Sequence, residues 1–340
     1  MNIQTAIARV IEGNSLVITE MESVMQQIMT GECTDAQIGG LLIALRMKGE
    51  TVEEISAAAK VMAGLASKVE IGAPHLIDIV GTGGDGTSTF NVSTAASFVA
   101  AGAGATVAKH GNRSVSSQSG SADLLEQAGA NLNLSAAQVQ EVIETAGVGF
   151  MFAPMHHSAM KYAIGPRKEM AVRTIFNVLG PLTNPAGVKK QVVGVFKPEL
   201  CETLASVLLE LGSEHSLVVH SEDGMDELSV CAPTLVAEAT HQGVTTYTVT
   251  PEDFGFKRAS IEDLVVADPA ESLKLIDSVF DGQNGSAKDM LALNAGAGIY
   301  VGGIASSLKQ GVELALQSID TGKAKAAKAA YVAATNQVGA

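Results

Sequence analysis

Residues 78–96 read DIVGTGGDGTSTFNVSTAA, and this stretch decides the fold. An apolar segment leads into a loop with glycines at positions 81, 83, 84 and 86, and small residues then begin a predicted helix. Glycine permits positive φ and close approach of the backbone to a ligand, and the free N–H groups at a helix start attract anions. The order strand, loop, helix therefore predicts an anion site at the edge of an α/β sheet. Neither the P-loop nor the dinucleotide-binding pattern fits the spacing.

Short apolar runs alternate with helical segments from residue 76 onward. The runs are LIDIV, TVAKH, VGFMF, QVVGVF, HSLVVH and TTYTVT. This alternation predicts an α/β fold with a central, largely parallel sheet and helices on both faces. Residues 1 to about 70 show helical patterns only, with Thr51 and Glu54 at capping-box spacing. We expect a helical domain at 1–70 with a returning helical section at about 155–186, and an α/β domain made of 71–154 and 187–340.

Composition and charge narrow the class of protein. Hydrophobic residues make up 46% and charged residues 17%, which is typical of a soluble globular protein. No apolar run approaches the roughly 20 residues that span a bilayer, and the amino terminus does not resemble a signal peptide, so we expect a cytoplasmic protein without a membrane partner. Cys33, Cys201 and Cys231 are too few and scattered for a disulfide framework. A net charge of −14 argues against a nucleic-acid partner.

Three further stretches carry polar chemistry. KHGNRSVSSQSGSADLLEQAG places Lys109 and Arg113 among hydroxyl and amide donors, which suits a phosphate with sugar hydroxyls, although a solvated polar loop is the alternative. In HSEDGMDELSV, Asp226 and Glu227 follow an apolar strand and are either magnesium ligands or a solvated acidic loop. The section from residue 155 to 186 is basic. Arg167 in this section is a candidate for bidentate binding of a substrate carboxylate. The alternative is that the section is an amphipathic helix with a cationic face.

Taken together, these motifs resemble the anthranilate phosphoribosyltransferases of tryptophan biosynthesis. The resemblance covers nearly the whole chain and rests on GTGGDG…FNVST, KHGNR…GSAD and RTIFNVLGPLTNPAG. It implies a small helical domain beside a large α/β domain, as in the nucleoside phosphorylase/phosphoribosyltransferase class. It also implies that phosphoribosyl pyrophosphate and Mg²⁺ bind in the cleft and that a homodimer forms through the helical domain. The implied reaction transfers the 5-phosphoribosyl group to the amine of anthranilate and releases pyrophosphate.

The resemblance also implies roles for single residues. Phosphoribosyl pyrophosphate would be bound by Gly81, Thr82, Gly84, Asp85, Thr89, Asn91, Val92, Ser93, Thr94, Lys109, His110, Gly111, Asn112, Arg113, Ser114, Val115, Ser116, Ser117 and Ser121. Anthranilate would contact Gly81, Asn112, His157 and Arg167. The metal would be bound by Ser93, Asp226 and Glu227. Lys109 would give electrostatic support, and no nucleophilic side chain is expected. The chain departs from the family pattern at Ser158, where the family usually has proline, and at Gly165–Arg167, where it usually has PVR.

Three rival functions remain open at this point. A pyrimidine nucleoside phosphorylase-like enzyme would run a similar sugar transfer with inorganic phosphate, but the Asp226–Glu227 pair and the KHGNR motif favour the transferase. A non-catalytic relative that binds nucleic acid is opposed by the net charge of −14. A purely structural role would leave the basic and acidic motifs unexplained.

Overall fold

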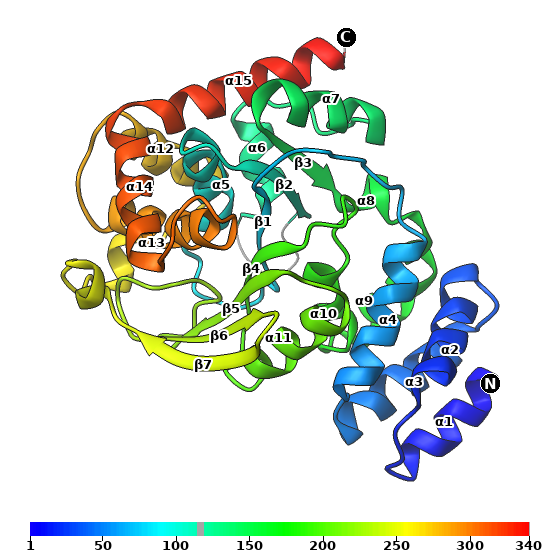
Figure 1. Ribbon diagram of the computed structural model, residues 1–340. Coiled ribbons are helices and arrows are strands. Elements are labelled where there is room, and N and C mark those ends of the chain that lie inside the picture. The colour runs from blue at the N-terminus through cyan, green and yellow to red at the C-terminus, as the bar shows by residue number, and fades with distance from the viewer. Residues whose placement is uncertain (114–118, 340) are drawn as a thin grey trace.

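The computed structural model describes residues 1–113 and 119–339 (Figure 1). Its first helices form a lobe beside the sheet, and α9 (Lys161–Met170) packs on α2 and α3 of this lobe. The helices of the lobe are α1 (Ile3–Ile11), α2 (Ile18–Thr30), α3 (Asp35–Lys48) and α4 (Val52–Gly64). Thr51 and Glu54 form the expected capping box at the start of α4. The buried Glu54 carboxylate also accepts from the Leu16 N–H at 2.9 Å and from Lys48 Nζ at 2.8 Å, which ties the loop before α2 to α4.

A seven-stranded sheet in the order β3-β2-β1-β4-β5-β6-β7 forms the centre of the other part. Its strands are β1 (Leu76–Gly81), β2 (Thr106–Gly111), β3 (Val148–Phe152), β4 (Lys190–Gly194), β5 (His215–Ser221), β6 (Thr234–Thr240) and β7 (Gly243–Val249). The strands from β3 to β5 pair in parallel, and β5, β6 and β7 pair antiparallel. The predicted, largely parallel sheet is confirmed. The sequence pattern missed β6, because the alternation in TLVAEAT is built from small residues with little apolar signal.

The remaining helices lie on both faces of the sheet and at its ends (Figure 1). The α-helices are α5 (Val92–Gly102), α6 (Ser121–Gln127), α7 (Ala136–Ala146), α8 (Ala153–His156), α10 (Phe176–Leu179), α11 (Leu200–Glu210), α12 (Pro269–Phe280), α13 (Ser286–Val301), α14 (Leu308–Asp320) and α15 (Lys323–Val338). The 3-10 helices are η1 (Ser158–Met160), η2 (Gly180–Leu182), η3 (Pro251–Phe254) and η4 (Ile261–Asp263). Among the described residues, no helix is both long and apolar enough to cross a membrane.

Two hydrophobic cores follow from the alternation of side chains along the strands. On β1, Ile77 and Ile79 face a core shared with α5 and α13, whereas Val80 faces a second core. This second core is continuous from α1–α4 through α10 and α11 to the sheet. The helical lobe is therefore joined to one face of the sheet by packed apolar side chains, at the side where β1 and β4 end.

Candidate active site

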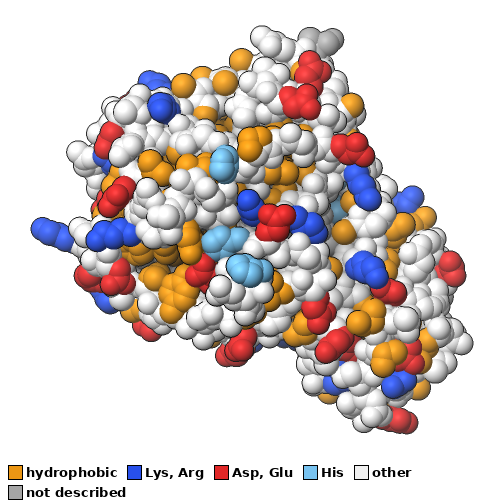
Figure 2. All heavy atoms as spheres, viewed as in Figure 1, with side chains coloured by type: hydrophobic (Ala, Val, Ile, Leu, Met, Phe, Trp, Pro, Cys, Tyr) orange, Lys and Arg blue, Asp and Glu red, His pale blue; other side chains and the backbone are white. Residues whose placement is uncertain are grey.

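The centre of the sheet contains a topological switch point. From β1 the chain moves to β2 and β3 on one side, and β4 and β5 then lie on the other side of β1. Open α/β sheets bind ligands at the carboxyl ends of such strands. The glycine loop follows β1, and Asp226 and Glu227 follow β5, so both motifs lie at this edge. Figure 2 shows basic and histidine side chains gathered around an acidic one near the middle of the face where Figure 1 places β1 and β4.

The glycine loop has the backbone geometry that the sequence indicates. Gly83, Gly84 and Gly86 all have positive φ. The Thr82 N–H donates to the Gly194 carbonyl at 2.9 Å, which holds the start of the loop to β4. Helix α5 begins directly after the loop, and its N-cap residue Asn91 makes no side-chain capping bond. The positive end of this helix therefore lies at the loop, as an anion site requires.

Two glycines allow Asp226 to lie directly against the strand ends. A Cβ on Gly81 would lie 2.5 Å from Asp226 Oδ2, and a Cβ on Gly194 would lie 1.6 Å from the main-chain oxygen of Asp226. The same carboxylate accepts from the Gly83 N–H at 2.8 Å. Asp226 thus links the ends of β1 and β4 to the glycine loop. The sequence reading missed Gly194, although a glycine inside a strand pattern signals this kind of close approach.

Acidic side chains converge below the loop. Burial raises the pKa of Asp226 to about 6, and the nearby Asp85 acts in the same direction. Burial, with Asp226 as a like-charged neighbour, raises the pKa of Glu227 well above its ordinary value. Glu227 also accepts from the main-chain N–H of Ser93. The structure therefore brings Ser93, Asp226 and Glu227 together.

This set of oxygens fits a magnesium ion. Buried like charges repel one another, and a divalent cation would remove that cost. In residues 1–113 and 119–339, no group of three or more His, Cys, Asp or Glu side chains could hold a metal. Magnesium commonly binds through one or two carboxylates and completes its shell with waters and substrate phosphates. The donors present match that pattern.

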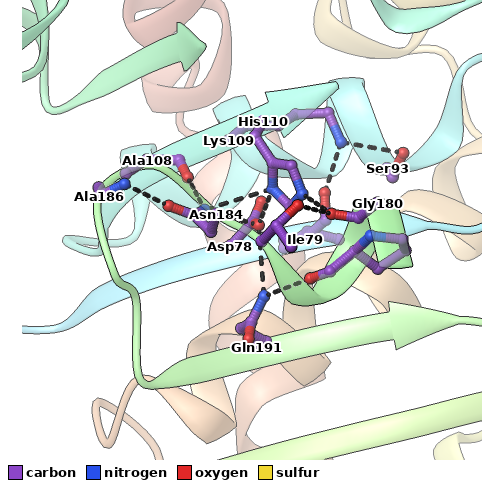
Figure 3. Close-up of polar contacts among 12 residues, drawn as sticks. Asp78, Ile79, Ser93, Ala108, Lys109, His110, Gly180, Asn184, Ala186 and Gln191 are labelled. Atoms are coloured by element: carbon purple, nitrogen blue, oxygen red, sulfur yellow. Dashed lines mark hydrogen bonds and ion pairs between the residues drawn. The ribbon is translucent and has the colours of Figure 1, made fainter. Parts of the chain in front are cut away.

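Lys109 lies between Ile79 and Ser93 and is almost fully buried (Figure 3). Its Nζ donates to the Ile79 carbonyl at 2.5 Å and to Ser93 Oγ at 3.2 Å. Burial lowers the pKa of Lys109, and the charges of Asp78, Glu227 and Asp226 act in the opposite direction. The Lys109 amine therefore holds Ser93 and lies close to the acidic pair.

His110 is part of a buried polar network (Figure 3). Its Nδ1 lies 2.5 Å from Asp78 Oδ2, and its Nε2 lies 2.7 Å from the Gly180 carbonyl. Asn184 and Gln191 reach the same carboxylate oxygen at 2.8 and 3.5 Å. Both ring nitrogens are bonded inside the protein, and the expected contact of His110 with phosphoribosyl pyrophosphate stays a prediction.

Arg113 is also bonded to other side chains of the protein. Its guanidinium bonds both oxygens of Glu126 at 2.5 and 2.6 Å, bonds Asp123 at 3.1 Å, and lies over the Phe152 ring. Hydrogen bonds to these acids raise its pKa. Both acids lie on α6 and hold the Arg113 side chain, and the expected phosphate contact of Arg113 stays a prediction. The predicted residues Ser114, Val115, Ser116 and Ser117 lie outside the described part of the chain.

The other predicted sugar and phosphate residues form a connected polar set. Thr94 Oγ1 donates to Ser121 Oγ at 2.9 Å, which joins α5 to α6. Asn91 accepts from Ser119 Oγ at 2.7 Å and from Ser272 Oγ at 2.8 Å. Other predicted residues lie along the loop and the strand end: Thr89, Val92 and Gly111. The set surrounds the first turn of α5.

The predicted anthranilate residues come from several segments. His157 is half-buried, and burial, with His110 as a positive neighbour, lowers its pKa to about 4, so its ring is neutral near pH 7. Its buried Nε2 has no partner in the described part of the chain. Arg167 is half-buried with its Cζ 5.3 Å from the Phe176 ring centroid, and no described acidic side chain pairs with it. Asn112 is exposed at the end of β2.

Arg173 is not among the ligands predicted from the sequence. This residue lies between α9 and α10, stacks on Phe196 and donates to the Gly84 carbonyl. It lies in the basic section, but charge alone did not distinguish it from its neighbours. Asp78 was missed as well, because a single acid inside an apolar strand gives no sign of its partner.

Comparisons with known proteins agree with this arrangement. Residues 73–325 match the description "Glycosyl transferase family, a/b domain", and residues 4–66 match "Glycosyl transferase family, helical bundle domain". The anthranilate phosphoribosyltransferase of Hahella chejuensis is 59% identical over 95% of both chains. That of Saccharophagus degradans is 58% identical over 96% of both chains. The chain belongs to the anthranilate phosphoribosyltransferase family.

Solved structures extend the likeness to the fold. The anthranilate phosphoribosyltransferase from Thermus thermophilus superposes with a TM-score of 0.92 at 44% identity, over 97% of this chain and 99% of its own. The Saccharomyces cerevisiae enzyme in complex with PRPP and Mg gives a TM-score of 0.89 at 26% identity, over 98% of both chains. The same yeast enzyme has also been solved in complex with 4-fluoroanthranilate. The resemblance predicted from the motifs is confirmed at the level of the family.

Proposed function

We propose that the protein transfers the 5-phosphoribosyl group from phosphoribosyl pyrophosphate to the amine of anthranilate, giving N-(5-phosphoribosyl)anthranilate and pyrophosphate in tryptophan biosynthesis. One observation carries the proposal. The glycine loop and the Asp226–Glu227 pair meet at the switch point between β1 and β4, joined by the Gly83–Asp226 hydrogen bond. This places donors for a diphosphate beside oxygens that suit magnesium. The identity of 59% with a curated family member supports the same reaction.

The mechanism needs no nucleophilic side chain. The neutral aromatic amine attacks the anomeric carbon, the carbon–nitrogen bond forms, and the bond to the pyrophosphate oxygen breaks. Negative charge collects on the leaving group, and the loop N–H groups are the donors aimed at that charge. A magnesium ion held at Ser93, Asp226 and Glu227 would neutralise part of it. Lys109 holds Ser93 in place from below, and the product amine releases its proton to solvent.

An assay with purified protein tests the function. Anthranilate fluorescence should disappear only when phosphoribosyl pyrophosphate and magnesium are both present. If anthranilate fluorescence is also lost when phosphoribosyl pyrophosphate or magnesium is left out, the proposal is contradicted. Phosphate-dependent cleavage of a pyrimidine nucleoside, with no anthranilate consumed, would support the phosphorylase instead.

The acidic pair should control the magnesium requirement. Replacing Asp226 and Glu227 together with alanine removes the carboxylate ligands, so we expect the magnesium concentration for half-maximal rate to rise roughly tenfold, equivalent to about 1.4 kcal/mol, and turnover to fall. A magnesium titration of steady-state rate measures this. Glu222→Ala, an exposed acid near the same loop, is the matched control. An unchanged titration for the double variant would exclude these residues as ligands.

Arg167 should bind the anthranilate carboxylate. A charge-assisted bond in a partly closed site contributes about 1.5–3 kcal/mol, so Arg167→Ala should raise the Michaelis constant for anthranilate roughly 10- to 150-fold. The constant for phosphoribosyl pyrophosphate should change little. Arg167→Lys should recover only part of the loss, because lysine lacks the planar pair of donors. Steady-state kinetics with each substrate varied in turn would check both constants.

Two results would contradict this role of Arg167. If both Michaelis constants rise together, Arg167 supports the fold or the junction between the lobes. If neither constant moves, another basic residue of the section binds the carboxylate, and Lys161 and Lys168 become the candidates.

We also propose that the protein is a homodimer through its helical lobe. A groove of about 630 Å³ lies between α1, α3 and α9, and it is lined mainly by apolar and small residues. Ile11 is 69% exposed, Met47 84% and Ile164 54%, and all three belong to these helices. Large apolar side chains gathered on one small lobe favour a self-complementary two-fold contact. Orange patches lie among charged side chains on this lobe in Figure 2.

Sedimentation at micromolar concentration tests the dimer. The species should have a mass near twice 34.9 kDa. Met47→Glu should shift it toward the monomer, because a charge would be buried in the contact. Leu65→Glu, at the end of α4 outside the groove, should leave the mass unchanged. A monomeric wild-type protein with full activity would contradict the proposal.

The cellular location is proposed to be the cytoplasm. Cys33, Cys201 and Cys231 are all free thiols. Burial raises the pKa of Cys201 to about 12, so this thiol stays protonated and packs as an apolar group. Free thiols suit a reducing compartment. Recovery of the activity in a membrane or extracellular fraction would contradict this location.

A further inference from the structure

Arg173 joins three parts of the molecule at the glycine loop. Its guanidinium donates to the Gly84 carbonyl, and its Cζ lies 4.0 Å from the centroid of the Phe196 ring after β4. Its own carbonyl accepts from the Arg46 guanidinium on α3. Arg173 thus connects the glycine loop to the strand edge and to the helical lobe. No residue in the sequence-derived set of substrate ligands has these contacts.

The peptide group that Arg173 holds follows a glycine. Reversing the Gly84–Asp85 peptide changes ψ of Gly84 and φ of Asp85, and Gly84, with φ of +78°, adopts many backbone conformations at little cost. In a trans peptide the C=O and the following N–H point in opposite directions. Turning the Gly84 carbonyl toward Arg173 therefore turns the Asp85 N–H to the opposite side. That N–H has no partner in the described part of the chain.

An earlier peptide of the loop, Thr82–Gly83, is held by the acidic site. The Gly83 N–H donates to Asp226 Oδ2 at 2.8 Å, and Thr82 Oγ1 accepts from the Phe196 N–H at 3.2 Å. Asp226 thus fixes the Thr82–Gly83 peptide, and Arg173 fixes the Gly84–Asp85 peptide. The loop would present a carbonyl oxygen to an anion if the Gly84–Asp85 peptide were reversed, and this contact would be repulsive.

We propose that Arg173 is a positioning residue that sets the orientation of the Gly84–Asp85 peptide, so that the Asp85 N–H is presented to the diphosphate of the substrate. The inference rests on the proposed transfer function. Phe196 stacks under the planar guanidinium and keeps it over the loop, a contact that a lysine cannot reproduce. Through Arg46, the same residue links the position of the helical lobe to the state of the loop.

Binding and kinetics of Arg173 variants test the inference. Arg173→Ala should weaken binding of phosphoribosyl pyrophosphate with magnesium, measured by calorimetry without anthranilate, by about tenfold, as expected for loss of a hydrogen bond from a charged donor. Its Michaelis constant for phosphoribosyl pyrophosphate should rise equally. The constant for anthranilate at saturating phosphoribosyl pyrophosphate should stay within about twofold, and the melting temperature should not change, because Arg173 is exposed.

Arg173→Gln separates hydrogen bonding from charge. Glutamine is neutral but keeps an amide donor for the Gly84 carbonyl, so it should recover part of the lost affinity. If Arg173→Gln behaves like Arg173→Ala and the loss vanishes at high salt, the guanidinium acts by long-range attraction to the phosphates and the positioning role is wrong.

Matched variants complete the test. Arg9→Ala removes a guanidinium that pairs with Glu20 inside the helical lobe, and it should leave substrate affinity unchanged. Arg46→Ala should change affinity less than Arg173→Ala, since the contact with Gly84 remains. A wild-type protein that never consumes anthranilate would overturn the proposed function. An active wild type with unaltered affinity in Arg173→Ala would overturn only this inference.

Discussion

Asp78→Ala is expected to lower the free energy of unfolding by about 3–5 kcal/mol, the usual cost of leaving a buried ionic partner unpaired. Asp78 is fully buried, and its Oδ2 accepts from His110 and Asn184. The other ring nitrogen of His110, Nε2, lies 2.7 Å from the Gly180 carbonyl oxygen. Removing the carboxylate leaves the imidazole and the amide without their acceptor. Denaturant unfolding monitored by circular dichroism measures the loss.

Further variants separate this effect from a simple change of volume. Asp78→Asn keeps the size of the side chain and should lose less stability than Asp78→Ala. The double variant with His110→Ala should lose less than the sum of the single losses, because the two groups interact directly. Lys60→Ala breaks an exposed ion pair with Glu22 and should change stability little. If Asp78→Ala unfolds at the same denaturant concentration as the wild type, the hydrogen bonds of Asp78 with His110 and Asn184 do not stabilise the protein.

Gly194→Ala is expected to reduce turnover by at least about a hundredfold, because even a shift of roughly 1 Å in catalytic groups has effects of this size. The added Cβ would lie 1.6 Å from the main-chain oxygen of Asp226, so the segment after β5 has to move. Asp226 and Glu227 would move away from Ser93 and the glycine loop. The magnesium requirement should rise in the same variant. Overpacking should also lower the free energy of unfolding by roughly 1–3 kcal/mol.

The matched control for this substitution is Gly64→Ala at the end of α4. A Cβ there has no neighbour within 4 Å, and alanine favours a helix more than glycine does. The steady-state rate and the magnesium requirement should differ sharply between Gly194→Ala and Gly64→Ala. If Gly194→Ala keeps wild-type turnover and magnesium dependence, the close approach of Asp226 to β4 is not needed for the reaction.

The sequence by itself determined the local elements and the family. The order of strand, glycine loop and helix at residues 78–96 and the capping box at Thr51 and Glu54 follow from patterns within a few residues. Helix periodicity, capping bonds and glycine turns depend on near neighbours, so these features are readable along the chain. The three ordered motifs then identified the family that the comparisons confirm.

Only the tertiary structure decided which polar side chains are free for substrates. Arg113 pairs with acidic side chains of α6, and His110 contacts Asp78. Lys109 donates to the Ile79 carbonyl and to Ser93. Several deciding contacts join residues far apart: Gly83 and Asp226 are separated by 143 positions, and Gly84 and Arg173 by 89. No local pattern records such pairs, because they arise only when β1, β4 and β5 align their carboxyl ends and the returning helical section packs beside them. The same alignment makes Gly194 necessary and gives Arg173 its place on the loop.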